Sequence, residues 1–284
     1  NNLDGNYLLQ MQNKDVEKKS KYLNFWINRF KKNKGFKFFF FDEQIKTDSF
    51  IYTSSNDFRI SSRMFNSLGY YGLLIIKNAL PQNELVKITN YFDDLEKLEN
   101  KNTWLTKPFK VKGRVDTELN VAKVDIDQFP YLKSYSDQAS TNIFNKKIKP
   151  NVDMHYLKII NESEDAIRGE TYLHSDRFAP HFKMFYTPYA ISDNDAPFEY
   201  ALQSHKINQD YIEFFKHSSF FDETDETSKT LYKETIKVTT DPNTLYIAFT
   251  NGLHRRSDFK SKSKRYMMFL QYVERFNKLN YLLP

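Results

Sequence analysis

Two histidines and one aspartate are the residues of this sequence whose types and spacing could do chemistry. His174 and Asp176 stand two positions apart, where a strand is expected to end. Residues two apart on a strand point to the same side of a sheet, so an imidazole and a carboxylate would face one point. His254 directly follows another expected strand. Two imidazoles and one carboxylate form the facial triad of non-haem Fe(II) oxygenases, which leaves coordination positions open. The spacing therefore indicates a metal site at His174, Asp176 and His254.

Basic side chains near these three residues are candidates for binding carboxylates. Arg265 begins the strand expected after His254, and a guanidinium can pair with a carboxylate through two hydrogen bonds. We expect Arg265 to lie on the strand paired with the one that carries His254, and to bind the far carboxylate of 2-oxoglutarate. Taken alone, Arg265 is better read as a surface residue at the start of a strand. Further candidates are Ser257 and Lys158 for the co-substrate, and Arg256, Arg177, Lys183 and Tyr186 for the substrate.

The other four histidines carry no comparable pattern. His205 stands in a Ser-His-Lys sequence, and we expect it to make structural hydrogen bonds rather than to bind a metal. His181 follows Pro180, and we expect it in the core or in the lining of a pocket. We assign no functional role to His155 or His217.

The segments that must position these residues are mostly short strands. Aromatic and β-branched residues gather in short runs, with turn residues such as Asn161, Gly169 and Pro180 between them. The expected strands are 154–160, 171–174, 181–191, 198–202, 235–239, 244–250 and 266–273. Short strands at this spacing indicate a β-sandwich or barrel with helices packed outside.

Helices are expected mainly before residue 152. Apolar residues recur at three- and four-residue steps over 81–99, where Pro81 suits the first turn. The other expected helices cover 15–32 and 130–148, a short strand follows Gly72 over 73–76, another covers 36–41, and 101–128 stays unassigned. We expect residues 1–61 to be an extension packed on one domain, 62–284, with a flap-like insert near 207–233.

Composition excludes several classes of site. The 284 residues contain no cysteine, which excludes disulfides, thiolate zinc sites and iron–sulfur ligation. The net charge of +6 is ordinary for a soluble protein, and no apolar run approaches the length of a membrane span. We therefore expect a soluble, cytoplasmic monomer or dimer that acts on a small anionic molecule rather than on nucleic acid. The first residue is Asn1, so a removed targeting leader stays open.

Four segments resemble, in order, the phytanoyl-CoA dioxygenase family of Fe(II)/2-oxoglutarate oxygenases. They are 68–80, His174-Ser175-Asp176, 196–206, and 245–249 together with His254, Arg265 and the strand to Tyr272. The resemblance covers about residues 62–274. The third segment departs from the family pattern, because Ala201, Leu202 and Gln203 stand where the family has a run ending in Pro-Gly.

The resemblance implies a mainly β protein with flanking helices and a double-stranded β-helix core, the cupin-like jelly roll. It also implies Fe(II) and 2-oxoglutarate as cofactors and O2 as co-substrate. Because family halogenases replace the metal-binding carboxylate by a small residue, Asp176 favours hydroxylation, desaturation or oxidative cyclisation. We expect a small carboxylate-bearing substrate, amino-acid-derived and belonging to natural-product biosynthesis. The alternatives are an acyl-CoA, a phosphonate or a macromolecule as substrate, and a non-catalytic binding protein on the same fold.

Overall fold

The structure, a computed structural model, describes residues 47–97, 106–111, 117–159, 173–176, 181–208, 210–211, 231–232, 234–257 and 262–272. The helix expected over 15–32, the strand expected over 36–41 and most of the insert expected near 207–233 lie outside these residues. Arg177 and His217 lie outside them as well. None of the described helices is long and apolar enough to cross a lipid bilayer.

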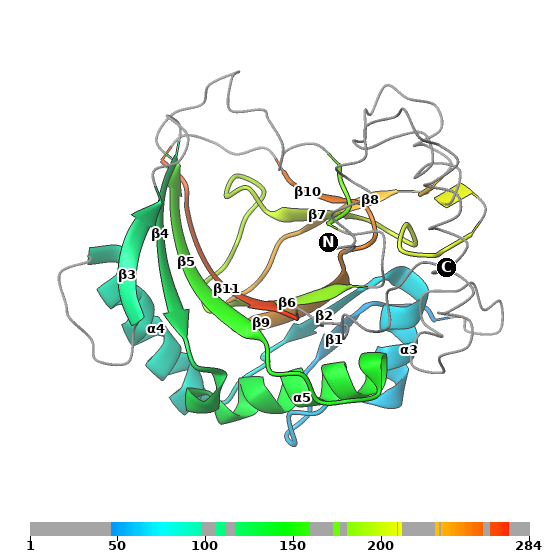
Figure 1. The fold of residues 1–284 in the computed structure, drawn as a ribbon, viewed down its shortest axis with the longest axis horizontal. Coiled ribbons are helices and arrows are strands. Elements are labelled where there is room, and N and C mark those ends of the chain that lie inside the picture. Colours follow the sequence, from blue (N-terminus) through cyan, green and yellow to red (C-terminus); the bar gives the residue numbers. More distant parts are fainter. Residues whose placement is uncertain are drawn as a thin grey trace, which may run out of the picture.

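The larger sheet has eight strands within the described part of the chain, in the order β1-β2-β9-β6-β11-β5-β4-β3 (Figure 1). Neighbouring strands are antiparallel except for the parallel edge pair of β1 and β2. The strands are β1 (Ile51–Thr53), β2 (Leu73–Lys77), β3 (Thr106–Val111), β4 (Thr117–Val124), β5 (Asn151–Ile159), β6 (Phe182–Thr187), β9 (Thr244–Phe249) and β11 (Lys264–Gln271). Since β1 belongs to this sheet, part of the segment before residue 62 is built into the main structure.

The smaller sheet is antiparallel, and its described strands run in the order β10-β7-β8. These strands are β7 (Phe198–Ala201), β8 (Thr235–Val238) and β10 (His254–Arg256). Figure 1 shows this sheet facing the concave side of the larger one. The side chain of Phe198 on β7 packs on Phe185 and Tyr246 of the larger sheet, with ring centroids 5.1 and 5.7 Å away.

The three α-helices of the described residues lie along the opposite, convex side of the larger sheet (Figure 1). They are α3 (Ser62–Tyr71), α4 (Gln82–Lys97) and α5 (Pro130–Phe144), with a short 3-10 helix, η2 (Ile126–Gln128), before α5. The apolar face of α4 buries Ile88, Phe92 and Leu95, as its three- and four-residue spacing predicts. The prediction of a mainly β protein with flanking helices is confirmed.

Alternation along the strands of the larger sheet sends one set of side chains toward the helices and the other toward the smaller sheet. On β9, Leu245 and Ile247 belong to the core that contains the helices, whereas Tyr246 and Ala248 belong to the core between the sheets. The period of two produces this division. Successive residues of β9 therefore face the helix layer and the space between the sheets in turn.

Two glycines make room for one tyrosine hydroxyl beneath the smaller sheet. Gly72 ends α3 with φ of 80°, in the left-handed region that favours glycine. A methyl group at Gly72 would clash with Tyr200 Oη and with the ring of His205. A methyl group at Gly252 would also clash with Tyr200 Oη, and it would lie 2.8 Å from Ser204 Oγ. Tyr200 fills the slot completely and donates a hydrogen bond to the Phe249 carbonyl at 3.0 Å.

Two strands lie in the segment that the sequence left unassigned, 101–128. On β4, Glu118 and Asn120 alternate with Leu119 and Val121, a period-two pattern too short to stand out within a mixed, polar segment. Asn120 is nevertheless buried on the helix side, where its Nδ2 donates to the Leu95 carbonyl at the end of α4. The polar residue Asn120 is thus buried on β4 because it binds the end of α4.

Candidate metal centre and its cavity

His174 and His254 face each other across a short backbone bridge. Each residue donates its N–H to the carbonyl of the other, at 2.9 Å in both directions. The following segment is held in the same way, because Asp176 N donates to the Thr250 carbonyl at 2.9 Å and Ser175 Oγ donates to the Asn251 carbonyl at 2.8 Å. The backbone therefore brings the two parts of the chain together without help from the side chains of the site.

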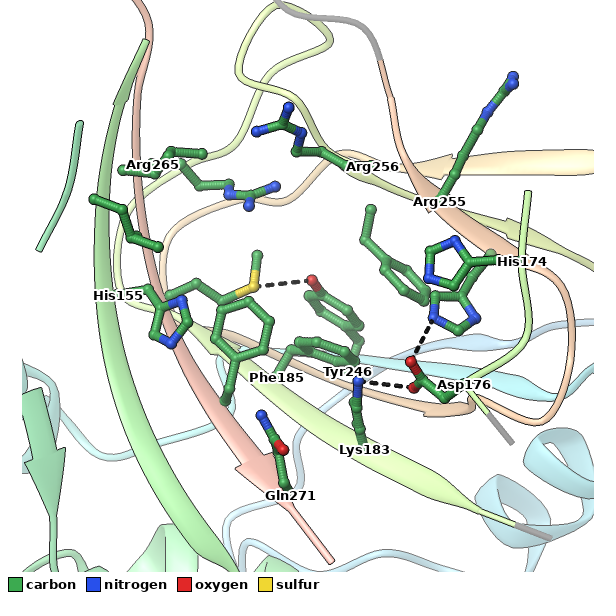
Figure 2. Close-up of a pocket in the computed structure, with 16 residues that line it drawn as sticks. His155, His174, Asp176, Lys183, Phe185, Tyr246, Arg255, Arg256, Arg265 and Gln271 are labelled. Carbon is green, nitrogen blue, oxygen red and sulfur yellow. Dashed lines mark hydrogen bonds and ion pairs between the residues drawn. The ribbon is translucent and has the colours of Figure 1, made fainter. Parts of the chain in front are cut away.

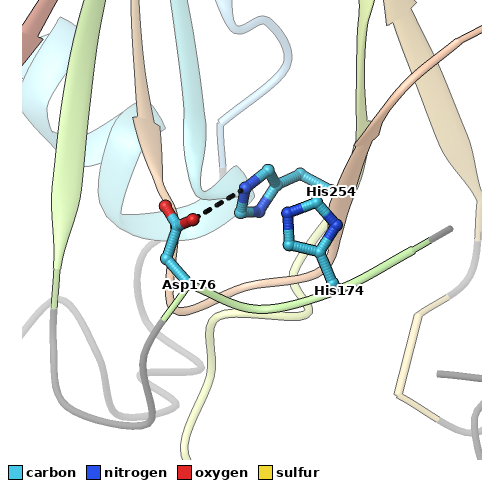
Figure 3. Close-up of side chains that lie close together, drawn as sticks. All are labelled: His174, Asp176 and His254. Atoms are coloured by element: carbon cyan, nitrogen blue, oxygen red, sulfur yellow. Dashed lines mark ion pairs between the residues drawn. The ribbon is translucent and has the colours of Figure 1, made fainter. Parts of the chain in front are cut away.

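The side chains of His174, Asp176 and His254 converge, as Figure 3 shows. One candidate ligand atom from each lies within 4.8 Å of the others. The two imidazole centroids are 4.6 Å apart, and His254 Nε2 lies 3.7 Å from Asp176 Oδ1. Two nitrogens and one carboxylate oxygen that meet at this spacing fit a single divalent metal ion.

The orientation of the His254 ring is fixed from behind. Its Nδ1 donates to the Gly252 carbonyl at 3.0 Å, so the opposite nitrogen, Nε2, is the one that faces Asp176. The ring also packs on Phe198, with centroids 5.3 Å apart. A hydrogen bond of this kind fixes the tautomer and the ring orientation of a metal-binding histidine. The spacing of the three ligand atoms and the fixed orientation of the His254 ring therefore both fit a metal centre.

Lys183 of β6 holds the carboxylate of Asp176. Its Nζ lies 2.7 Å from Asp176 Oδ2, while Oδ1 faces His254. Burial raises the pKa of Asp176, but interactions with His254 and Lys183 outweigh burial and hold the pKa well below its usual value. Asp176 is therefore ionised, as a metal ligand must be.

A cavity of about 400 Å³ opens beside the three residues, between the two sheets. This volume falls within the range of small-molecule sites. Figure 2 shows its aromatic floor, where Phe185 stacks on Tyr246 with centroids 4.7 Å apart. Its cationic lining residues are Lys183, Arg255, Arg256 and Arg265, and the carboxylate among the described lining residues is Asp176. The cavity therefore favours anions.

Arg265 reaches the cavity from the larger sheet. The expected pairing of its strand with the strand of His254 is wrong, because β11 pairs with β5 and β6 whereas β10 pairs with β7. The two strands belong to different sheets that face each other, a relationship that sequence order does not reveal. The Arg265 guanidinium crosses between the sheets and donates to the Ala196 carbonyl, just before β7.

Arg255 and Ser257 flank Arg256 on β10 and bind the same buried carboxylate. Arg255 Nε and Nη2 each donate to Glu199 at 2.9 Å, and Ser257 Oγ donates to Glu199 Oε2 at 2.9 Å. Burial raises the pKa of Glu199, but hydrogen bonds from Arg255, Thr235 and Ser257 outweigh burial and keep the pKa below its usual value. The hydroxyl of Ser257, a candidate for binding 2-oxoglutarate, is thus committed to Glu199.

Two other candidates face away from the cavity. Lys158 is exposed on β5, on the face opposite to the lining residues His155 and Leu157. Tyr186 is fully buried on the helix side of β6, where it donates to Asn243 Oδ1 at 2.9 Å. Strand alternation is the reason, because Lys183 and Phe185 occupy the cavity face of β6.

The two histidines near the site differ in role. His205 is fully buried outside the cavity lining, and its Nε2 donates to the Gly69 carbonyl at 3.1 Å. His155, which had no assigned role, lines the cavity. Burial, together with the positive charges of Arg265 and Lys183, lowers the pKa of His155 to about 3. The ring is therefore neutral at physiological pH and adds no charge to the cavity.

Sequence reasoning missed most of the apolar lining. On β11, the lining residues are Arg265, Met267, Phe269 and Gln271, which alternate along the strand. Once Arg265 is placed in the cavity, a period of two identifies the other three. The same alternation from Lys183 identifies Phe185. The alternation is visible in the sequence. To use it, one must know where the strand begins and which of its residues faces the cavity.

The fold and the site define a jelly-roll protein with a His-Asp-His centre between its two sheets. Among solved structures, the chain is similar to EctD from S. alaskensis in its apoform, with 13% identity, a TM-score of 0.51, and 79% of this chain and 81% of that chain covered. It also matches SnoK, a non-heme alpha ketoglutarate dependent carbocyclase from nogalamycin biosynthesis, with 10% identity, a TM-score of 0.49 and coverage of 81% and 94%.

The likeness to EctD confirms the predicted fold, the cupin-like jelly roll known as the double-stranded β-helix. No protein-family model matches the sequence, and no curated protein matches it. Chemistry must therefore be argued from the site itself.

Proposed function

We propose that this chain is an Fe(II)/2-oxoglutarate-dependent oxygenase of the phytanoyl-CoA dioxygenase-like type. The observation that carries the proposal is the convergence of His174, Asp176 and His254, with ligand atoms within 4.8 Å, at a cavity lined by cations. The four sequence segments support the family type, because they occur in the same order as in that family. When bound, Fe(II), 2-oxoglutarate and O2 supply the oxidising power that breaks an unactivated C–H bond.

The protein's own residues orient and shield this chemistry. His174, Asp176 and His254 would hold the iron, and the Gly252 carbonyl and Lys183 would keep His254 and Asp176 in position. Arg265 would bind the far carboxylate of 2-oxoglutarate. Phe185, Tyr246 and the other aromatic lining residues would limit the access of water to the space beside the metal. Positioned binding of both substrates is the main contribution of the chain to the rate.

The substrate we propose is a small carboxylate-bearing metabolite, amino-acid-derived and used in natural-product biosynthesis. The cationic lining and the volume of about 400 Å³ support a small anion. The presence of Asp176 in the metal site favours hydroxylation, desaturation or oxidative cyclisation over halogenation. Lys183 lines the cavity as a substrate-binding residue would, but its ammonium lies 2.7 Å from Asp176 Oδ2 and holds that carboxylate.

The first test is anaerobic binding of Fe(II) and then 2-oxoglutarate, followed through the weak visible charge-transfer band of a chelated 2-oxoacid. We expect the band in the wild type and its loss in His254→Ala, which removes a metal ligand. Arg265→Ala should keep the band but need at least about tenfold more 2-oxoglutarate, since it loses a charge-assisted hydrogen bond.

Absence of the band in the wild type, together with no heat of 2-oxoglutarate binding in calorimetry, contradicts the oxygenase proposal. A non-catalytic binding role on the same fold then becomes the better account. Lys158→Met is the control, because it removes a positive charge from the outer face of β5 and should leave the band unchanged.

A further inference from the structure

Arg256 of β10 differs from its two sequence neighbours, Arg255 and Ser257, whose side chains both bind Glu199. It stands two residues after His254, so both side chains lie on the same face of the strand. Arg256 is 8% exposed and lines the cavity. Arg255, by contrast, points away from the metal site in Figure 2 and binds Glu199. Arg256 is therefore a buried cation of the cavity lining, and Figure 2 shows its guanidinium on the side of Arg265, away from His174 and Asp176.

Arg265 approaches the same end of the cavity from the opposite sheet. Its guanidinium donates to the carbonyl of Ala196. The next residue, Pro197, accepts a hydrogen bond from Ser257 N at 2.9 Å, and Phe198 pairs with Arg256 in the sheet. Figure 2 shows the two guanidinium groups on the same side of the cavity. Two arginines, one from each sheet, thus define what we call the arginine end.

The other end of the cavity carries different polar groups. Lys183 pairs with Gln271 across β6 and β11, and Lys183 also binds Asp176. Gln271 is six residues from Arg265 on the same strand, so their Cα atoms lie roughly 20 Å apart. We call the part lined by Lys183 and Gln271 the lysine end. Among the described lining residues, the carboxylate belongs to Asp176, beside Lys183.

From this geometry we infer that Arg256 is a co-substrate residue and not a substrate residue. Together with Arg265 it forms a double guanidinium clamp for the far carboxylate of 2-oxoglutarate. The inference rests on the proposed function, because it assigns a specificity-determining residue for the co-substrate of that reaction. Two forks from opposite sheets select a second carboxylate on the 2-oxoacid by charge and by geometry.

The test compares two 2-oxoacids that differ at the clamp. 2-Oxoglutarate carries a second carboxylate, whereas 2-oxobutyrate carries only the 2-oxoacid group that chelates a metal. Anaerobic Fe(II)-loaded wild type, Arg256→Met and Arg256→Lys are titrated with each compound by calorimetry and by the charge-transfer band. Lys158→Met is the matched control for the loss of one positive charge.

We expect Arg256→Met to weaken 2-oxoglutarate binding about tenfold or more, as the loss of a charge-assisted hydrogen bond predicts. Binding of 2-oxobutyrate should stay unchanged. Arg256→Lys keeps the charge but loses the fork, so it should weaken 2-oxoglutarate binding less. Should the melting curve show that Arg256→Met does not fold, Arg256→Lys decides the question by the same comparison.

Two results overturn the inference while the proposed function stands. One is unchanged 2-oxoglutarate binding in both Arg256 variants, which would leave Arg256 as a candidate for binding the substrate. The other is an equal loss for both 2-oxoacids, which shows a general effect on the site. A wild type that binds neither 2-oxoacid overturns the proposed function and the inference together.

Discussion

At the scale of single residues, the carbonyl of Gly252 connects the fold to the metal centre. It accepts the hydrogen bond from His254 Nδ1, and the residue is close-packed against Tyr200, Ser204 and His205. The space that the glycine leaves is therefore also the space that lets its carbonyl face His254. A change at this position alters packing and metal binding at once.

We expect Gly252→Ala to lower both stability and metal affinity. The added methyl group overpacks the site, which costs about 1–3 kcal/mol. The displaced carbonyl loses its hold on His254, and loss of such a partner typically costs roughly 10–100-fold in metal affinity. Chemical denaturation and Co(II) titration measure the two effects.

Gly72→Ala is the matched control, because its methyl group meets the same Tyr200 hydroxyl but lies outside the metal site. It should lose stability and keep the wild-type affinity for Co(II). Equal losses of metal affinity in the two variants would contradict the role assigned to the Gly252 carbonyl.

The triad is predictable from sequence because His174 and Asp176 stand two apart and His254 follows a recognisable apolar strand. For the remaining candidates, the side of the sheet on which each lies can be found only by counting along the strand from a residue whose side is known. Lys183 and Tyr186 are three apart on β6, so they cannot both face the cavity. Arg256 and Ser257 are adjacent, and only Arg256 lines the cavity. Strand boundaries, which sequence patterns place poorly, decide these assignments.

At the scale of elements, Glu199 joins the two strands that carry the distal half of the site. It lies on β7, is 3% exposed, and binds Arg255 and Ser257 on and after β10. The pairing of β7 with β10 is only three residues long. A pairing this short has few backbone hydrogen bonds. The side-chain hydrogen bonds of Glu199 therefore add to the connection between β7 and β10.

Acid should weaken this connection. The pKa of Glu199 in the folded protein is below its ordinary value of 4.5, so its ion pair contributes fully above about pH 4.5. The contribution is lost as the pH falls through the lowered pKa. Glu199→Gln keeps an acceptor but not the charge, and we expect a loss of about 1–3 kcal/mol at pH 7.

Urea denaturation between pH 7 and pH 3 measures this prediction. The wild-type free energy of unfolding should fall toward that of Glu199→Gln as the pH decreases, and the difference should be largest at pH 7. A constant difference across the range would show that the charge of Glu199 contributes nothing.

Strand order is the part of the fold that the sequence did not reveal. Period-two patterns and turn residues identify β5, β6, β7, β9 and β11 singly, but they do not show which strands are neighbours. The pairing of β11 with β5 and β6 joins distant parts of the chain. For this reason Arg265 was expected beside His254 and instead faces it from the other sheet. The three residues of β10, His254, Arg255 and Arg256, also lack the apolar pattern of a strand.

At the scale of the whole molecule, the proposed ligands would connect the two sheets. His254 belongs to the smaller sheet, whereas Lys183 and Arg265 belong to the larger one. A metal ion with 2-oxoglutarate between them would bind only the folded arrangement, since the groups meet only there. Binding of this kind raises stability by mass action.

We expect Fe(II) and 2-oxoglutarate to raise the melting temperature under anaerobic conditions. A ligand at 100 times its Kd contributes about 2.7 kcal/mol, which corresponds to roughly 5–10 °C for a chain of this size. Differential scanning fluorimetry measures the shift. His254→Ala should show no shift with Fe(II), and an equal shift in that variant would place the binding elsewhere.

The slot around Tyr200 has a consequence for the history of the sequence. Gly72 and Gly252 lie far apart along the chain, yet each leaves room for the same hydroxyl. In any lineage of this protein, a side chain at either glycine position requires a smaller residue at position 200. Replacement of the tyrosine is necessary but not sufficient, because Gly72 also lies against the ring of His205 and Gly252 also lies against Ser204. The two glycines and their shared neighbours therefore form one unit of covariation.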